Sequence, residues 1–350
     1  MRTMYRLLLL LALFCFFLVA PVMAAWEINM ALGTTREVTD SLLNPENVLA
    51  LSTEHYGTTQ VIFGDQWLSS DLVFLFSFES WLAYSHTEHR LSNTITECYL
   101  SFMPWENIYL DLGKVYYQPG VGFFKNPSAF LLPAGAQINK IYYGGREKNE
   151  GRIILRGQYF SPTAVYELIY SPEIRWDREN EYLNCLGSQQ DEEILLCSVA
   201  GHAAGFDLAG SVCYDRRLRF GGNLAYVVGN NLELHLELAV EQKDASQINK
   251  KNDLYRQLTG ETAADLGILS QRLIPSFILG THYTFPSQWN LMFEYYFNGL
   301  GFHSGEWAKI RERLIENNKF YKNPEKRPQV MTALTTAKSL IDVSGIPGMV

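Results

Sequence analysis

Hydrophobic and polar residues alternate one by one along several stretches of this chain. The clearest stretch is 231–240, where every even position is Leu or Val and the odd positions are mostly polar. An alternation of period two gives an extended strand one apolar face and one polar face. Strands of soluble proteins average about 5 to 6 residues, whereas a tilted membrane strand needs about 9 to 11. The length of this stretch therefore predicts a membrane-spanning β-strand.

The same alternation recurs along most of the chain. It predicts thirteen strands, at 26–36, 58–64, 71–84, 94–103, 108–117, 151–160, 164–171, 193–200, 206–214, 218–227, 231–240, 275–285 and 289–298. Short turns are expected at 104–107, 161–163, 229–230 and 286–288, and long polar segments at 118–150, 172–192, 241–274 and from 299 onward. Short turns at one end and long loops at the other are typical of an outer-membrane barrel. We therefore expect an all-β fold, an antiparallel transmembrane β-barrel over 25–298 with helices in its long extracellular loops.

The last part of the chain, 299–350, does not alternate and is expected to be a long loop with two helices. Ser304 is a candidate cap for a helix with Trp307, Ile310 and Leu314 on one face. A second helix would gather the apolar side chains of Val330, Met331, Leu334, Ala337, Leu340 and Ile341. Bacterial single-chain barrels have an even number of strands, so at least fourteen are expected, with one or more beyond this sequence. A miscount by one strand is the alternative.

The first 24 residues have the form of an export signal. Arg2 and Arg6 precede an apolar run at 7–19, and small residues around Ala24 provide a cleavage site. The run is shorter than the roughly 20 residues that a spanning helix needs. Cleavage after Ala24 removes two arginines and no acidic residue, so the formal net charge falls from -8 to -10. Such acidity without a basic patch argues against nucleic acid as a partner.

Composition supports a surface that faces lipid. Charged residues are 19% of the chain and aromatic residues 13%, against about 25% charged in a typical soluble protein. Aromatic side chains also gather near the ends of the expected strands, as at interfacial girdles: Trp81, Tyr84, Tyr116, Tyr117, Tyr159, Phe160, Phe285 and Trp289. An aromatic-rich core is the alternative for these residues.

In pattern and topology the mature chain resembles Gram-negative outer-membrane β-barrel proteins of the porin kind. Two passages look similar to parts of porin-like barrels: 109–114 followed by 120–124 and 126–127, and 298–301 followed by Glu306 and Trp307. No motif in the chain identifies a single family. The resemblance implies an outer-membrane location, contact with outer-membrane lipid and passage of small polar solutes. A homo-oligomer and a monomer are both compatible with it.

Sites for catalysis, cofactors or metals do not emerge from the sequence. His303 lies beside Ser304 within 301–305, but a helix cap accounts better for this serine than a nucleophile does. His86, Glu88 and His89 lack a third fixed metal ligand, and the glycines lack phosphate-loop spacing. After export four cysteines remain, which allow three pairings. Cys185 and Cys197 flank one polar stretch and form a candidate disulfide.

Function is instead expected in the barrel lumen. The alternation turns a set of polar residues inward as candidate pore-lining groups: Glu79, Glu97, Asp111, Arg152, Arg156, Glu167, Asp207, Arg219, Glu233, His235, Glu237, His282 and Glu294. Three acids are expected to pair with the three arginines, which leaves an acidic excess. Rings of carboxylates favour cations. The first hypothesis is therefore a passive, mildly cation-leaning pore, and the alternative for these charges is bracing of a plugged barrel.

The segment 118–150 is too apolar for a free loop and is expected to pack inward. Candidate constriction residues are Phe123, Phe124, Lys125, Lys140 and Arg146, the basic ones opposing the acidic wall. Packing on neighbouring loops above the barrel is the alternative. A non-conducting binding or envelope-assembly protein is the second functional hypothesis, and a barrel hydrolase is a third.

Overall fold

The computed structural model describes residues 25–35, 54–69, 71–85, 89–122, 126–131, 150–175, 190–242, 245–261, 273–299, 301–302 and 304–344. Over these residues it confirms the thirteen predicted strands. They are β1 (Ala25–Thr35), β2 (Glu54–Ser69), β3 (Leu72–Ser85), β4 (His89–Trp105), β5 (Ile108–Val115), β6 (Arg152–Phe160), β7 (Ala164–Ser171), β8 (Ile194–Ala203), β9 (Phe206–Tyr214), β10 (Leu218–Val228), β11 (Leu232–Gln242), β12 (Leu273–Thr284) and β13 (Asn290–Asn298). Each strand pairs antiparallel with the next along the chain, so the sheet order is the sequence order. The predicted export signal lies outside the described residues.

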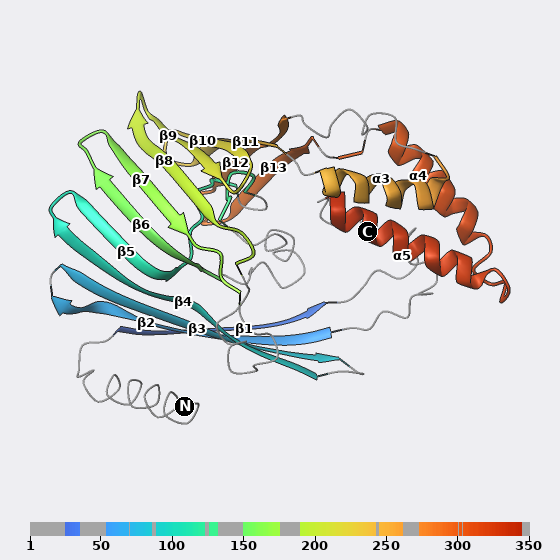
Figure 1. Ribbon diagram of the computed structural model, residues 1–350, viewed down its shortest axis with the longest axis horizontal. Helices are drawn as coiled ribbons and strands as arrows, with labels where there is room; N and C mark the ends of the chain where they lie inside the picture. Colours follow the sequence, from blue (N-terminus) through green and yellow to red (C-terminus); the bar gives the residue numbers. More distant parts are fainter. Residues whose placement is uncertain are drawn as a thin grey trace.

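The single sheet curves so that β1 to β4 lie opposite β9 to β13 (Figure 1). Short turns join the strands at one end of the sheet, among them 106–107, 161–163, 204–205, 229–231 and 285–289. The other end carries the long connections 36–53, 116–151, 172–193 and 243–272, together with two short ones, 86–88 and 215–217. We call these the short-turn end and the long-loop end. The predicted asymmetry between the two ends is confirmed.

The two faces of the sheet differ in exposure, as β11 shows most clearly. Leu234, Leu236 and Leu238 are about 40% exposed on its outer face. His235 and Glu237 between them are buried on the inner face. The outer faces of other strands carry exposed large side chains as well, among them Tyr166, Leu168, Leu291, Phe293 and Tyr295. The sheet is therefore apolar on its outer face and polar on its inner face, as the alternation predicts.

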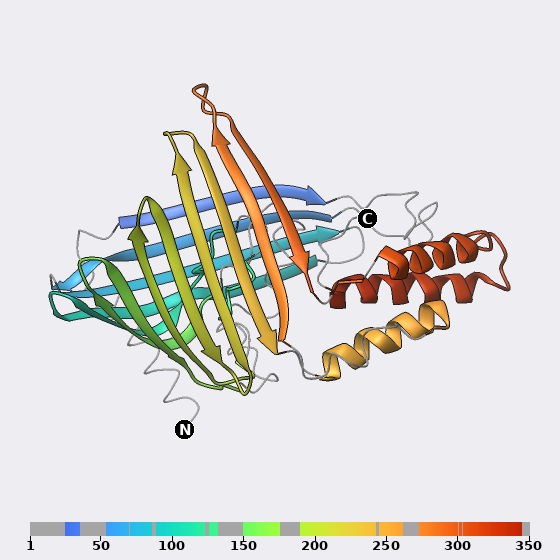
Figure 2. The ribbon, with the colours of Figure 1, turned by 90° about the horizontal axis from the view of Figure 1, so that it is seen from above.

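Three helices pack together beyond the long-loop end (Figure 2). They are α3 (Ala245–Thr259), α4 (Ser304–Asn318) and α5 (Arg327–Ser344). The two helices expected after residue 299 are confirmed, and Ser304 is the first residue of α4. The sequence interpretation missed α3, which comes from the loop between β11 and β12. No helix among the described residues is long and apolar enough to cross a lipid bilayer.

A buried apolar cluster holds the three helices together. Fully buried members come from all three helices: Tyr255 of α3, Leu314 of α4, and Val330 and Leu334 of α5. Tyr255 and Leu258 lie one turn or less apart, so they share a face of α3. The cluster also includes Ile274 at the start of β12, which ties the helices to the sheet. The long loops therefore contribute a structured helical unit at this end of the sheet.

The predicted aromatic girdle is present in part. Tyr159, Phe160, Phe285 and Trp289 are exposed and lie at the short-turn end. The expectation that Tyr117 belongs to this girdle is wrong. Its side chain is buried inside the curve of the sheet, where its hydroxyl donates a hydrogen bond to Glu167. It follows β5 in a segment that leaves the sheet and turns inward. The predicted strand 108–117 accordingly ends at Val115.

Candidate functional site

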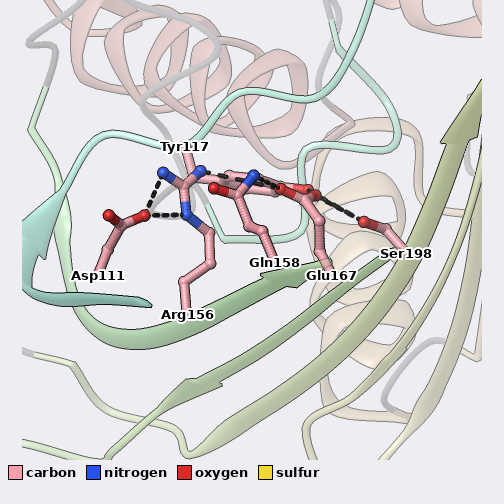
Figure 3. A network of polar contacts seen from close by, with 6 residues as sticks. All are labelled: Asp111, Tyr117, Arg156, Gln158, Glu167 and Ser198. Carbon is pink, nitrogen blue, oxygen red and sulfur yellow. Dashed lines mark hydrogen bonds and ion pairs between the residues drawn. The ribbon is translucent and has the colours of Figure 1, made fainter. Parts of the chain in front are cut away.

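An arginine lies between two carboxylates on the inner wall of β5 to β7. Arg156 contacts Asp111 through Nε at 2.6 Å and through Nη2 at 2.5 Å. Its Nη1 lies 3.9 Å from Glu167 Oε1. Asp111 is almost fully buried and the arginine side chain is 19% exposed, so the pair is shielded from bulk solvent. The three predicted lumen residues therefore form one charged group with a carboxylate in excess (Figure 3).

Neutral donors surround the second carboxylate of this group. Glu167 Oε1 accepts a hydrogen bond from Gln158 Nε2 at 2.6 Å. Its Oε2 accepts from the hydroxyls of Tyr117 and Ser198, each at 2.7 Å (Figure 3). Strand register explains the arrangement, because Gln158 pairs with Glu167 across β6–β7 and Glu167 pairs with Ser198 across β7–β8. Directly opposed residues of neighbouring strands project from the same face of the sheet.

The other two predicted arginines do not pair with predicted wall acids. Arg219 Nη2 contacts Asp215 Oδ2 at 2.7 Å, and Asp215 lies in the short connection 215–217. Arg152 donates to Ser171 Oγ at 2.7 Å and to the backbone carbonyl of Glu192 at 2.5 Å. The expectation that each arginine would pair with one wall acid is thus wrong, because connections at the long-loop end supply closer partners.

Acidic and basic side chains gather at this long-loop end of the wall. Arg217 Nη2 lies 3.4 Å from Glu192 Oε1 and 3.6 Å from Asp215 Oδ2. Partial burial raises the pKa of Glu192, and the neighbouring carboxyl of Asp215 raises it further. Because the cluster combines both charge signs, it braces the connections 190–193 and 215–217 against the barrel wall.

Residues 116–122 and 126–131, which we call the inward segment, fold against the inner wall of β7 to β11. Glu237 of β11 is its main anchor. Carboxylate oxygen Oε2 accepts hydrogen bonds from the backbone N–H groups of Val121 at 3.0 Å and Gly122 at 3.2 Å. The other oxygen, Oε1, accepts from the N–H and the hydroxyl of Ser128, both at 2.7 Å. Four donors therefore enclose one predicted lumen carboxylate.

A row of small residues lets the inward segment approach the wall closely. Ser211, Gly221 and Ala239 are opposed across β9, β10 and β11. A Cβ at Gly221 would lie 2.8 Å from Ser128 Cβ and 2.9 Å from the Phe130 ring, so a larger residue would push the segment away. Beside this row, Asn223 Nδ2 donates to the carbonyl of Pro119 at 2.9 Å.

The apolar side chains of the inward segment meet an apolar part of the inner wall. Phe130 and Leu131 are buried in a cluster that includes Ile169, Leu196 and Cys213. Arg219 lies 4.9 Å from the centre of the Phe130 ring. The described residues of the predicted constriction loop, 118–122 and 126–131, therefore pack inward, as expected, and are held by both apolar and polar contacts.

A second buried pair lies on the wall of β11 to β13. His235 Nε2 is 3.0 Å from Glu294 Oε1, and both side chains are at most 3% exposed. The imidazole crosses over Gly280, which pairs with His235 on one side and with Glu294 on the other. Glu233 Oε1 lies 3.5 Å from Nδ1 of the same ring. Three predicted pore-lining residues are thus brought together.

The remaining predicted pore-lining residues are more scattered. Glu97 accepts a hydrogen bond from the N–H of Tyr116 at 3.0 Å, at the root of the inward segment. Glu79 shares the inner face of β3 with the buried Ser77. Asp207 and His282 lie towards the short-turn end, where Asp207 contacts His202 at 2.9 Å and is largely exposed.

Several expectations lie outside the described residues. The constriction candidates Phe123, Phe124, Lys125, Lys140 and Arg146 all belong to this group, and so do Cys185, His86, Glu88 and His303. Cys197 is exposed on β8, and its pairing with Cys185 stays a prediction because Cys185 is not described. In the part of the chain that the structure describes, no three His, Cys, Asp or Glu side chains are placed to hold a metal ion.

Sequence reasoning missed several polar residues of this wall, among them Tyr117, Ser128, Asp215 and Asn223. Asn223 could have been found, because it faces inward by the same alternation that identified the charged residues. Tyr117, Ser128 and Asp215 lie in connections, where no period tells which way a side chain points.

No protein-family model and no curated protein matches this chain. Among solved structures, OmpF of Salmonella typhi in complex with daunomycin is 12% identical, with 78% of this chain and 77% of that chain covered and a TM-score of 0.45. A mutant of the Rh. blastica porin is 9% identical, with 75% and 81% covered and a TM-score of 0.41. OprD of Pseudomonas aeruginosa is 8% identical, with 79% and 59% covered and a TM-score of 0.39. At such identities and TM-scores these similarities carry no argument about function.

Proposed function

We propose that the protein is a porin-like channel of the Gram-negative outer membrane, through which small polar solutes pass without a catalytic step. The observation that carries the proposal is the two-faced sheet, with exposed Leu234, Leu236 and Leu238 outside and charged side chains inside. An apolar outer belt suits lipid, and charged groups within hydrocarbon are costly unless they face water or one another. The curved sheet gives them an inner wall to face.

We propose that the inward segment narrows the channel on the β7–β11 side. Its two ends are fixed to different strands, Tyr117 to Glu167 of β7 and Ser128 to Glu237 of β11. A segment held at both ends occupies lumen that solute would otherwise fill. Deleting 120–135 is therefore expected to raise conductance.

We further propose a mild preference for cations. Eight acidic residues were predicted on the inner wall against three arginines, and one of these arginines, Arg156, contacts two of the acids. Asp215, an acid that was not among those eight, is the partner of Arg219. Carboxylates lining a lumen lower its potential and favour cation entry.

A closed barrel is the second candidate, in which the protein binds at the cell surface or assists envelope assembly. The observation that favours it is the extent of internal bonding, since Glu167, Glu237 and Glu294 are each hydrogen-bonded to protein groups. Charges that brace one another need no passing solute. The helical unit at the long-loop end would then carry the binding surface.

Planar bilayers separate the two candidates. Refolded full-length protein is expected to insert and give discrete conductance steps, whereas a closed barrel inserts without them. Under a KCl gradient the reversal potential is expected to have the sign of cation preference. A clear anion preference would contradict the selectivity alone, and insertion without conductance would contradict the channel. The same protein unfolded by heating serves as the control for detergent artefacts.

A further inference from the structure

The hydrogen-bond donors around Glu237 all come from one short stretch of chain. The N–H groups of Val121 and Gly122 are consecutive, and Ser128 adds an N–H and a hydroxyl six residues further on. Each carboxylate oxygen receives two of the four hydrogen bonds. The wall contributes the anion, and the inward segment contributes all the donors.

The backbone of the inward segment lies close against the Glu237 carboxylate. Gly120 has no side chain, and a Cβ there would lie 2.5 Å from Glu237 Oε2 and 2.2 Å from Asn126 Oδ1. Asn126 and Ser128 are buried beside the anion. Consecutive backbone N–H groups that converge on one point form an anion-binding concavity. Hydrogen bonds to an ionised acceptor are about twice as strong as neutral ones.

We propose that residues 120–122 and 126–128 form a binding site for carboxylate groups, of which Glu237 is the resident occupant. A carboxylate carried by a solute competes with Glu237 for the same donors and so loosens the inward segment from β11. Small carboxylate-bearing solutes are therefore the class that this constriction recognises. The inference rests on the proposed channel, because solutes reach the segment through the lumen.

Removing the resident carboxylate tests the proposal directly. Glu237→Ala leaves the donors in place and opens room for a free carboxylate. We expect the variant, refolded in detergent, to unfold at a lower temperature than the wild type. About 100 mM sodium acetate is expected to raise its Tm by about 2–4 °C above the value in equal sodium chloride. In planar bilayers, replacing chloride with acetate is expected to bring the conductance of Glu237→Ala back towards the wild-type value.

Three further variants make the test specific. Glu237→Gln fills the same space with a neutral amide, so acetate has no room to bind and no rescue is expected. Adding Ser128→Ala to Glu237→Ala removes one donor and should raise the acetate concentration needed by about tenfold. Asp207→Ala deletes a largely exposed carboxylate towards the short-turn end, and its Tm should not respond to acetate.

Equal Tm values of Glu237→Ala in acetate and in chloride overturn the proposal. A response of Asp207→Ala as large as that of Glu237→Ala also overturns it, because the effect of acetate would then be general. The Tm readout does not depend on conduction. A rescue of Tm in a protein that never conducts would therefore contradict the channel while supporting the carboxylate site.

Discussion

The imidazole of His235 lies directly over Gly280 of the neighbouring strand. A Cβ at position 280 would be 2.1 Å from His235 Nε2 and 2.9 Å from Glu294 Cγ. The histidine of β11 reaches the carboxylate of β13 only because the intervening strand has no side chain there. The glycine is thus part of the His235–Glu294 contact.

Gly280→Ala is predicted to separate this pair and to lower the free energy of unfolding by about 2–3 kcal/mol, since a buried carboxylate would lose its partner. Gly210→Ala is the matched control, because a Cβ at Gly210 of β9 would meet nothing within 4 Å. The control should change stability by less than about 0.5 kcal/mol. Urea unfolding in detergent measures both, and equal effects would contradict the assigned contact.

Arg156→Met is predicted to lower the free energy of unfolding by about 3 kcal/mol, because it leaves the buried Asp111 without its cation. Arg175→Gln breaks the ion pair with Glu173 on a side chain that is 71% exposed. Exposed pairs contribute about 0–1 kcal/mol, so this control should change little. The comparison uses the same urea unfolding, and a near-neutral Arg156→Met would show that the wall charges are solvated individually.

Lys251 makes the helical unit sensitive to alkaline pH. Its Nζ donates to the carbonyl of Gly301 at 3.0 Å and lies 4.0 Å from the centre of the Phe302 ring. Burial lowers the pKa of this lysine from 10.5 to about 8. Between these values the unfolded chain binds the proton and the folded chain does not, so stability rises with pH across the interval.

The expected rise is about 3 kcal/mol between pH 8 and 10.5. It is measured from the thermal unfolding of the helical circular-dichroism signal. Lys251→Met should abolish the pH dependence and stabilise the unit at neutral pH. A variant that keeps the full slope would show that another group titrates.

Leu334→Ala is predicted to destabilise the helical unit by about 2–5 kcal/mol, because this side chain is fully buried among the three helices. Ile315→Ala, on a side chain that is 43% exposed, should have a much smaller effect. Thermal unfolding followed by the helical circular-dichroism signal measures the stability of both variants. If conductance also fell in Leu334→Ala, the unit would have a role in the channel itself.

The strands could be predicted because a sheet with one apolar and one polar face requires a period of two along each strand. The stretch 231–240 alternates almost without exception, and the structure places β11 at Leu232–Gln242. Helix α3 was not predicted from the sequence. Its buried Ile248, Tyr255 and Leu258 are spread among lysines and other polar residues, so that its segment resembled a polar loop.

The wall residues were predictable as inward-facing, but their partners were not. Alternation identified Glu237 as an inward carboxylate, yet three of its four donors are backbone N–H groups, which leave no mark in a sequence. Arg219 was assigned to the wall, whereas its partner Asp215 lies in a connection. Contacts between a strand and a distant loop depend on how the chain folds back, which periodicity does not encode.

The most direct test of the account compares the single-channel conductance of the full-length protein with that of a variant lacking 120–135. We predict discrete steps from the full-length protein and larger steps from the deletion, because the inward segment is proposed to narrow the lumen from the β7–β11 side. Inserted protein that gives no steps in either form would contradict the channel. Steps of equal size would contradict the role of the inward segment.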